Sequence, residues 1–490
     1  MSFNGPLVVT FVAYLMLILY LGIKAYKQTH NHGDYILGGR RLGSVVTALS
    51  VGASDMSGWL LLGLPGAIYL SGISEVWIGV GLVIGAYFNW LFVAKPLRIY
   101  SEHANNSITL PDYFENRFSD KSRILRVISA LVILLFFTFY TASGLVGGAI
   151  LFEHSFGLDY SVALVAGTII IVCYTFIGGF LAVVWTDAIQ AILMLLALVI
   201  APIAVITIGG GASAVIDRMQ LVNPESTSLF SQLSFMSFIS LIAWGLGYFG
   251  QPHILSRFMA AENPAKLVSA RRIAMSWMSI VLLGSIATGL AGIAYFADAP
   301  LDNPETVFIV LSQSLFNPWV AGIITAAILS AIMSTIDSQL LVSSSVISED
   351  FYRAFVRPKA SEKELLLVSR AAVILIAVLA LIIASDRQSG VLDLVSYAWA
   401  GFGAAFGPVI LFSLFWRKMT SLSAIIGMLL GAITVVVWSN LNGGLFDLYE
   451  IIPGFMLASL AIFVVSLLRA NPEESSLQLY DSAKSLIKVS

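Results

Sequence analysis

The sequence has little cysteine and little charge. Cys173 is the only cysteine among 490 residues, so the chain can form no internal disulfide and no cysteine-based metal site. Lys, Arg, Asp and Glu make up 11% of the residues, whereas a soluble domain is about one quarter charged. The formal net charge of −2 gives no sign of a nucleic-acid partner, and nothing in the sequence indicates an obligate protein partner.

What the chain has instead is apolar sequence. Hydrophobic residues make up 58% of it, more than a soluble fold of this length can bury in one core. The apolar runs are about 20 residues long, as in membrane helices, and lack the alternation of a β-barrel. The sequence therefore predicts an all-α integral membrane protein. No Lys or Arg precedes Lys24, which favours a retained first helix over a cleaved signal peptide.

Charge and turn residues divide the apolar sequence into thirteen segments. They are 6–26, 43–71, 74–97, 124–152, 158–180, 184–207, 233–258, 273–296, 315–346, 366–385, 390–416, 421–440 and 449–468. If these segments alternate across a bilayer, 24 of the 26 Lys and Arg residues fall on one side, and only Arg218 and Arg387 fall on the other. The positive-inside rule then places the N-terminus outside and the C-terminus inside.

The order of the segments predicts four parts. Residues 1–42 form a first helix and cytoplasmic loop, 43–207 a first five-helix repeat, 208–440 a second and inverted five-helix repeat, and 441–490 a last helix and cytoplasmic tail. The polar loop 349–365 and the tail 470–490 are too short for a core of their own, so we expect solvated connectors there.

Two of the segments are interrupted. ALSVGASDMSGWLLLGLPG (48–66) and AWGLGYFGQPH (243–253) carry glycines near their middle and close with Pro65 and Pro252. Five spans separate the two segments in order, so they run in opposite directions, as an inverted repeat requires. Matched Gly/Pro interruptions point to a transporter site near the bilayer midplane, although each glycine is also explained by close helix packing.

The segment 315–346 carries a row of oxygen-bearing side chains. Ser330, Ser334, Asp337 and Ser338 recur at helical spacing on one face, with Thr335 beside them. Hydroxyls combined with free carbonyls suit sodium or a proton better than a divalent cation, which needs several carboxylates. Hydroxyls that merely bond back to their own helix are the structural alternative.

Three carboxylates lie within the predicted spans. Asp187 in WTDAIQ is explained either by a helix N-terminus or by a function. Asp55 and Asp337 lie deeper, and a buried ionisable group in a membrane is a functional hypothesis by default. A buried ion pair with an arginine such as Arg40 is the structural alternative.

At these residues the sequence resembles the sodium:solute symporter family, and within it the branch that transports proline. Matching blocks run through nearly the whole chain: DYILGGRRLG (34–43), SDMSGWLLLGLPGA (54–67), LPDYF (110–114), LVILLFFTFYTASG (131–144), YTFIGGFLAV (174–183), AWGLGYFGQPHIL (243–255), MSTIDSQLLV (333–342) and LVSYAWAGFGAAFGP (394–408). The resemblance implies thirteen transmembrane helices, a leucine-transporter-like inverted repeat and two broken helices.

The resemblance also implies site residues. The family's main sodium site falls here on the carbonyls of Ala53, Met56 and Ala331 and the hydroxyls of Ser334 and Thr335. Asp55 is implied as a further sodium-linked residue. The substrate contacts of the proline branch fall on Ser57, Gly63, Tyr140, Trp244, Tyr248 and Pro252.

The chain departs from the proline branch at Asp337, where that branch carries a serine. Some family members bind a second sodium near this position, together with the aspartate that matches Asp187. Asp187, Asp337 and Ser338, beside Ser334, are therefore candidates for a second sodium site. The alternative is that Asp337 is protonated and has no part in ion binding.

These observations predict sodium-coupled uptake of L-proline across the cytoplasmic membrane by alternating access. Another small amino acid or a monocarboxylate remains the alternative substrate. An ion channel is disfavoured because no ring of charge or repeated filter element is visible. An enzyme is disfavoured because no catalytic constellation and no phosphate-binding motif is visible, and we expect no cofactor beyond the coupling Na+.

Overall fold

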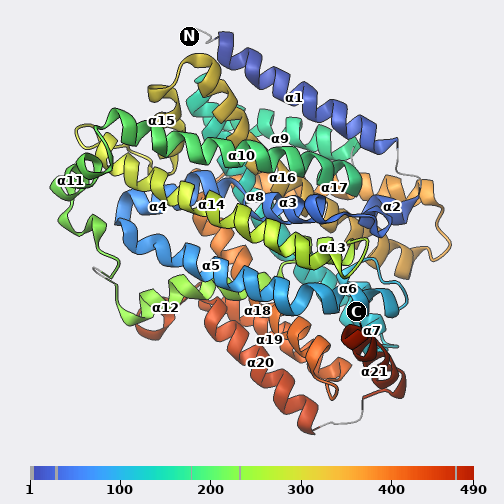
Figure 1. The fold of residues 1–490 in the computed structure, drawn as a ribbon. Helices are drawn as coiled ribbons and strands as arrows, with labels where there is room; N and C mark the ends of the chain where they lie inside the picture. The colour runs from blue at the N-terminus through green and yellow to red at the C-terminus, as the bar shows by residue number, and fades with distance from the viewer. Residues whose placement is uncertain (1–4, 28–30, 178, 231–232, 469–471, 490) are drawn as a thin grey trace.

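The computed structural model describes residues 5–27, 31–177, 179–230, 233–468 and 472–489. These residues form helices packed roughly side by side, with both termini at the edge of the bundle (Figure 1). Among them the only β pairing is an isolated parallel bridge between Leu42 and Ala261.

The first half of the chain contains the helices up to α11. They are α1 Gly5–Tyr26, α2 His32–Leu37, α3 Ser44–Asp55, α4 Leu64–Ser71, α5 Val76–Phe88, α6 Ala94–His103, α7 Leu110–Phe118, α8 Ile124–Phe156, α9 Tyr160–Ile177, α10 Phe180–Ile208 and α11 Ala212–Val222. Short helical turns connect several of them, including η1 Gly38–Arg40, η2 Trp59–Gly63, η3 Ile73–Glu75, η4 Asn89–Val93 and η5 Pro224–Thr227.

The second half contains the helices from α12 onward. They are α12 Phe235–Ala243, α13 Pro252–Met259, α14 Lys266–Tyr295, α15 Val307–Leu315, α16 Pro318–Ser345, α17 Glu362–Ala384, α18 Val391–Phe415, α19 Ser421–Trp438, α20 Ile451–Leu468 and α21 Glu474–Val489. The connecting turns are η6 Trp244–Gly250, η7 Pro304–Thr306, η8 Val346–Val356 and η9 Gly444–Asp447.

Ten helical segments of the described chain are long and apolar enough to cross a membrane. The bent pair Ser44–Asp55 and Trp59–Ser71 passes the same test as one unit, which gives up to eleven. Tyr160–Cys173 and Phe235–Gly250 are apolar but shorter. Each of the thirteen predicted segments falls on helical residues, and ten or eleven of them qualify as spans by length and composition.

Both predicted interruptions are real breaks in helix geometry, and only the second lies next to its proline. At the first break, α3 ends at Asp55, and Met56 leaves helical geometry with ψ 75°. The chain bends by 61° before helical structure resumes at Trp59. Pro65 lies beyond this break, in the first turn of α4. The second break lies at Gln251, which is extended with ψ 109°, and Pro252 begins α13 directly after it.

Close packing explains some glycines of the second interruption as well. A Cβ on Gly245 would lie 2.2 Å from the Gly81 carbonyl oxygen of α5, and a Cβ on Gly247 would lie 1.9 Å from Nε1 of Trp399. No larger residue fits at either position without moving the neighbouring helix. The break and the packing are therefore both properties of this segment.

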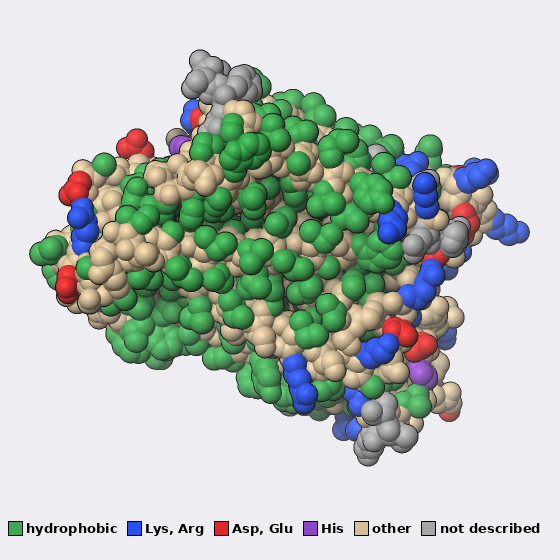
Figure 2. All heavy atoms as spheres, turned by 45° about the horizontal axis from the view of Figure 1, so that its top comes forward, with side chains coloured by type: hydrophobic (Ala, Val, Ile, Leu, Met, Phe, Trp, Pro, Cys, Tyr) green, Lys and Arg blue, Asp and Glu red, His purple; other side chains and the backbone are tan. Residues whose placement is uncertain are grey.

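Charge and hydrophobicity are segregated on the surface. In the view of Figure 2, hydrophobic side chains cover the middle of the molecule, and Lys and Arg gather at one end. That end holds α2, α7 and α21 (Figure 1), and we call it the basic end. Exposed apolar residues on the long helices include Leu135, Ile169, Ile203 and Leu283, as expected for a surface that faces lipid.

The C-terminal tail does not fit the prediction of a solvated connector. It forms α21, which contacts α6 and α7. The Tyr480 hydroxyl donates to the Phe415 carbonyl over 2.9 Å, and the buried Arg117 guanidinium lies over the Tyr480 ring. The loop after α16 likewise continues as the helical turn η8. An amphipathic helix can bury its apolar face on a larger domain without a core of its own.

Candidate functional site

The first break leaves backbone carbonyls beside α16. The Ala53 carbonyl accepts a hydrogen bond from Ser334 Oγ over 2.7 Å and lies 3.5 Å from Thr335 Oγ1. Both hydroxyls also reach the Ala331 carbonyl, over 3.1 Å and 3.3 Å. Ser334 is fully buried and Thr335 is 2% exposed.

These atoms form a compact set of uncharged oxygens. Two carbonyls and two hydroxyls from α3 and α16 converge, as the resemblance predicted for Ala53, Ala331, Ser334 and Thr335. Uncharged oxygen ligands fit a hard monovalent cation and not a divalent one. Met56 is buried at the same break, where its amide donates to the Gly52 carbonyl over 2.8 Å.

Asp55 ties the break to two tyrosines. Its Oδ2 accepts from the Tyr248 hydroxyl of η6, and its carbonyl lies 3.5 Å from the Tyr140 hydroxyl of α8. The same carbonyl accepts from Trp59 Nε1 over 3.2 Å. Among the described residues, Asp55 Oδ1 has no hydrogen-bond partner, although it is buried. Asp55 therefore makes no ion pair with Arg40, which instead donates to the Ser107 carbonyl over 2.8 Å.

The second break is held by α18. Trp399 Nε1 donates to the Trp244 carbonyl over 2.7 Å, and the Trp399 ring meets the Tyr248 ring edge-on at 5.0 Å. Gln251 Nε2, at the break itself, donates to the carbonyls of Gly247 and Trp399 over 3.1 Å and 3.3 Å. The backbone groups that the break releases are thus satisfied within the protein, as a membrane interior requires.

Three predicted substrate residues cluster and three lie apart. Asp55 links Tyr140 and Tyr248 through hydrogen bonds, and Ser57 follows directly at the break. Trp244 reaches this cluster through Trp59, with ring centroids 6.4 Å apart. The remaining two, Gly63 and Pro252, line different cavities.

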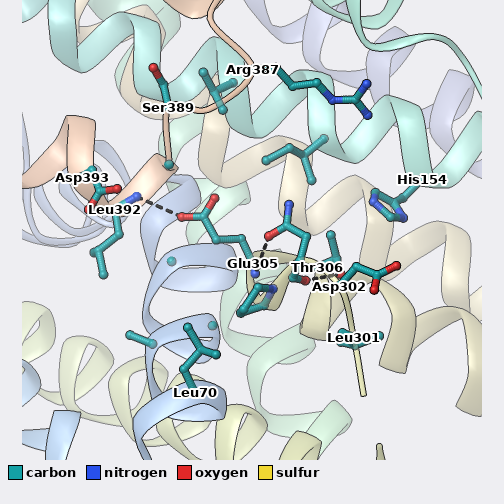
Figure 3. A pocket seen from close by; sticks show the side chains of 18 of the residues that line it. Leu70, His154, Leu301, Asp302, Glu305, Thr306, Arg387, Ser389, Leu392 and Asp393 are labelled. Atoms are coloured by element: carbon teal, nitrogen blue, oxygen red, sulfur yellow. Dashed lines mark hydrogen bonds between the residues drawn. The ribbon is translucent and has the colours of Figure 1, made fainter. Parts of the chain in front are cut away.

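Gly63 lines a cavity of about 1030 Å³ at the end opposite the basic end, which we call the vestibule. Figure 3 shows Leu70, Glu305, Arg387 and Asp393 around it, from helices far apart in sequence. Pro252, in contrast, lines a cavity of only about 20 Å³ together with Thr109 and Val342. The large cavity therefore lies on the side of Gly63, and the cavity beside Pro252 is small.

Glu305 closes one wall of the vestibule. Its carboxylate accepts from the backbone N–H groups of Val391 and Leu392, the first two residues of α18, over 3.1 Å and 3.0 Å (Figure 3). Burial raises the pKa of Glu305 above its ordinary value, although the two N–H donors oppose the shift. A carboxylate at a helix N-terminus also interacts favourably with the helix dipole.

Asp187 is not at a helix N-terminus. It lies about two turns after α10 begins at Phe180, and its Oδ2 pairs with Arg257 Nη2 of α13 over 3.1 Å. The same oxygen accepts from Ser50 Oγ over 2.6 Å. The interpretation of Asp187 as a dipole partner of its own helix is therefore wrong. The buried ion pair, which the sequence suggested only for Asp55 and Asp337, is formed by Asp187 with Arg257.

Asp337 and Ser338 are neighbours on α16, but their side chains contact different partners. Ser338 Oγ accepts from Arg257 Nη2 over 2.6 Å and donates back to the Ser334 carbonyl. Asp337 Oδ1 accepts from Thr175 of α9, and its Oδ2 is buried without a partner. Among the predicted oxygen row, Ser330 donates to the Ala326 carbonyl of its own helix, as the structural alternative expected.

Sequence reasoning missed three residues of this region. Arg257 was counted with the charges of a cytoplasmic connection, yet it is 1% exposed inside α13. Its position four residues after His253, inside a predicted span, was the available signal. Trp59 and Trp399 carried no signal, because a tryptophan in a membrane helix is more often core than site.

Comparison with known proteins gives a consistent result. The sequence profile of the sodium:solute symporter family matches residues 35–431. The sodium/proline symporter of Escherichia coli (strain K12) is 55% identical over 478 residues, 96% of this chain and 95% of that protein. The high-affinity proline transporter PutP of Bacillus subtilis (strain 168) is 51% identical over 461 residues, 94% of this chain and 97% of that protein.

Among solved structures, a Na+-coupled sialic acid symporter in a substrate-bound outward-open state has a similar fold. The superposition of the two structures has a TM-score of 0.81 at 20% sequence identity, and it covers 96% of this chain and 99% of the sialic acid symporter. A nucleobase-cation-symport-1 family transporter in a closed conformation has a TM-score of 0.56 at 16% identity, over 92% of this chain and 99% of that one. At these identities the similarity concerns the fold alone.

Proposed function

The chain belongs to the sodium:solute symporter family, and on that premise we propose that it takes up L-proline by coupling proline entry to the entry of sodium. One observation carries the proposal: the Ser334 and Thr335 hydroxyls converge on the Ala53 carbonyl where the first helix breaks. Relatives named sodium/proline symporter, which match the chain over nearly its whole length, point to the same ion and substrate.

Sodium is the coupling ion. It binds the carbonyl oxygens of Ala53, Met56 and Ala331 and the hydroxyls of Ser334 and Thr335. Asp55 adds a negative charge near this cage, and its unpartnered Oδ1 is free to turn toward the ion. Because α3 and α16 each supply ligands, sodium binding ties the broken helix to α16.

Proline binds between the two broken helices. Its contacts are Ser57, Gly63, Tyr140, Trp244, Tyr248 and Pro252. The pyrrolidine ring packs on the faces of Trp244 and the tyrosines, and the secondary ammonium meets an aromatic face or a carbonyl oxygen. Backbone N–H groups at the breaks bind the carboxylate. Another small amino acid or a monocarboxylate would bind at the same residues but would make fewer of these contacts.

Alternating access couples the two solutes. Sodium and proline enter through the vestibule, the vestibule closes, and the basic end opens beside Pro252. One sodium ion that moves down about 100 mV and a tenfold gradient releases roughly 2.3 plus 1.4 kcal/mol, enough for several-hundred-fold accumulation of a zwitterion. Sodium needs only to favour the substrate-competent state by a few kcal/mol.

The architecture proposed with this function is that of thirteen membrane helices. Residues 43–207 and 208–440 form the two inverted five-helix repeats, preceded by 1–42 and followed by 441–490. The concentration of Lys and Arg at one end supports a cytoplasmic basic end and an N-terminus on the outside of the cytoplasmic membrane (Figure 2).

A single coupling sodium fits the contacts better than two. The hypothesis of a second site uses Asp187, Asp337 and Ser338, but the Arg257 guanidinium already donates to Asp187 and Ser338. A second sodium between those residues has to displace this cation. Isotope fluxes of sodium and proline at several voltages give the ratio directly: one ion per proline is expected, and two would establish the second site.

Uptake of labelled proline by vesicles that contain the full-length protein tests the function. An inward sodium gradient is expected to drive transient accumulation above equilibrium, and replacement of external sodium by choline is expected to abolish it. Empty vesicles are the control. Accumulation that persists without sodium, or that an unlabelled monocarboxylate suppresses better than unlabelled proline does, would contradict the proposal.

A further inference from the structure

Trp244 has an aromatic neighbour from outside both proposed repeats. Tyr449 lies in the connection between α19 and α20, and its ring stacks on the Trp244 indole with centroids 5.5 Å apart and planes 28° apart. The Tyr449 side chain is almost fully buried, with 8% of the residue exposed. A stacked aromatic pair stabilises the position of both rings beyond the effect of the area it buries.

Tyr449 is fixed at both of its ends. Its hydroxyl donates to the Ser396 carbonyl of α18 over 2.8 Å, and its backbone N–H donates to Ser240 Oγ of α12 over 3.0 Å. Its carbonyl accepts from the Ile452 amide over 3.0 Å. A ring held in this way has one orientation, so the indole stacked on it also has one.

The rest of the connection supports this position. Trp438 Nε1 donates to the Leu448 carbonyl over 2.9 Å, which anchors the chain directly before Tyr449. Trp438 also packs edge-on against Phe446, with centroids 4.8 Å apart. This second aromatic pair also stabilises the connection, but among the described ring contacts neither of its rings touches Trp244. It is therefore a matched comparison for the pair of Tyr449 and Trp244.

The stacked pair faces space that a solute can reach. Trp244, Tyr449, Ser240 and Ser396 all line a cavity of about 800 Å³. This cavity shares Ser389, Gly390 and Asp393 with the vestibule. The Trp244 indole therefore lies between a solvent-accessible cavity and the cluster of Asp55, Tyr140 and Tyr248. At this place the orientation of the indole decides how much room remains for the ring of a substrate.

We infer that Tyr449 is a positioning residue for substrate selection: by fixing the Trp244 indole plane, it sets which ring size the site accepts. The inference rests on the proposed function, because it takes Trp244 as a wall of the proline site. It adds a residue from the connection between α19 and α20, which belongs neither to the broken helices nor to α16.

Proteoliposomes with the full-length protein test this role through Tyr449→Leu. The half-saturating proline concentration is expected to rise about fivefold to tenfold, with the maximal rate within about twofold of wild type. Azetidine-2-carboxylate and pipecolate have four- and six-membered rings. In competition with these two compounds, the variant is expected to prefer proline by a smaller factor than the wild type does. Sodium binding without proline is expected to stay unchanged.

Two variants serve as controls. Tyr449→Phe keeps the stacked ring, and its half-saturating proline concentration is expected to stay within about twofold of wild type. Phe446→Leu disrupts the neighbouring aromatic pair and is expected to leave ring-size preference unchanged. In a Trp244→Ala background, Tyr449→Leu is expected to add less than about twofold, because the two residues act through one contact.

The outcomes separate the inference from the proposed function. If the wild type takes up proline, and Tyr449→Leu has the same half-saturating proline concentration and the same ring-size preference, only the role of Tyr449 is overturned. Tyr449 is then a structural residue. Failure of the wild type to accumulate proline would overturn the proposed function itself. If Tyr449→Leu does not reach the membrane, Tyr449→Met fills part of the space with a flexible side chain and removes the aromatic face, with the same expected result.

Discussion

Arg257 Nη2 lies 3.1 Å from Asp187 Oδ2, and the two side chains are 1% and 0% exposed. The same guanidinium donates to Ser50 of α3 over 2.8 Å and to Ser338 of α16 over 2.6 Å. One cation thus connects the second broken helix, through α13, with the first broken helix and with the helix that carries the proposed sodium ligands.

This ion pair is expected to be costly to break. Asp187→Asn or Arg257→Gln alone leaves one buried charge without its partner, which typically costs about 3 to 5 kcal/mol. The double variant removes both charges and is expected to recover much of that loss. Thermal unfolding of the purified protein measures all three.

An exposed pair provides the control. Arg387 and Glu153 lie 2.6 Å apart with 68% and 25% of their side chains exposed. Glu153→Gln is expected to cost less than about 1 kcal/mol, because water screens the pair. A double variant of Asp187 and Arg257 that is as unstable as the worse single variant would mean that hydrogen bonds, and not paired charge, hold this region.

Sodium affinity is expected to depend on the two hydroxyls that face Ala53. Ser334→Ala and Thr335→Val each remove one oxygen ligand from a buried cation, and each is expected to weaken sodium binding about tenfold or more. Sodium dependence of proline uptake, measured at saturating proline, gives the change.

Ser330→Ala is the matched control on the same helix, because the Ser330 hydroxyl donates to the Ala326 carbonyl of its own helix and, among the described contacts, does not reach the Ala53 carbonyl. It is expected to leave sodium affinity within about twofold of wild type. If it weakens sodium binding as much as Ser334→Ala does, the ligands do not lie at the break.

The first break shows what the sequence can and cannot predict. A run of glycine and serine with an aspartate, inside an apolar segment, is enough to predict that the helix stops there, because the backbone groups it exposes need partners. The sequence placed the break near the middle of the segment and Pro65 at its close, and α3 indeed ends at Asp55, before the chain is helical again at Trp59. Proline is tolerated in the first turn of a helix, so it does not have to end one.

Long-range partners were beyond prediction from residue types alone. Asp187 and Arg257 are 70 positions apart, and α10 and α13 meet only in the folded bundle. Local spacing identified Ser334 and Thr335 as a possible ligand pair, because both lie on one helix. It did not reveal that Tyr449, from the connection between α19 and α20, stacks on Trp244.

Trp244 is expected to serve the substrate and not the ion. Trp244→Ala is expected to raise the half-saturating proline concentration at least tenfold and to leave sodium binding within about twofold, because the indole has no contact with the Ala53 carbonyl set among the described contacts. Trp319→Ala, on an indole that is 54% exposed, is the control. Equal losses in proline and sodium affinity would show that Trp244 is a structural tryptophan.

Glu305 is expected to make stability depend on pH. In the folded protein burial raises its pKa above the ordinary 4.5, so the folded state holds a proton on Glu305 at pH values where the unfolded chain has lost it. The stabilisation from this proton is fully present below about pH 4.5 and is lost as the pH rises through the raised pKa. Glu305→Gln does not titrate, and its amide oxygen still accepts one N–H from the start of α18.

The melting temperature of Glu305→Gln, relative to wild type, is therefore expected to rise between pH 4.5 and pH 7.5, because only the wild type comes to bury a charged carboxylate over this range. A difference for Glu305→Gln that falls with rising pH would mean that the two N–H donors of α18 outweigh burial, and that the carboxylate is the form the folded protein favours.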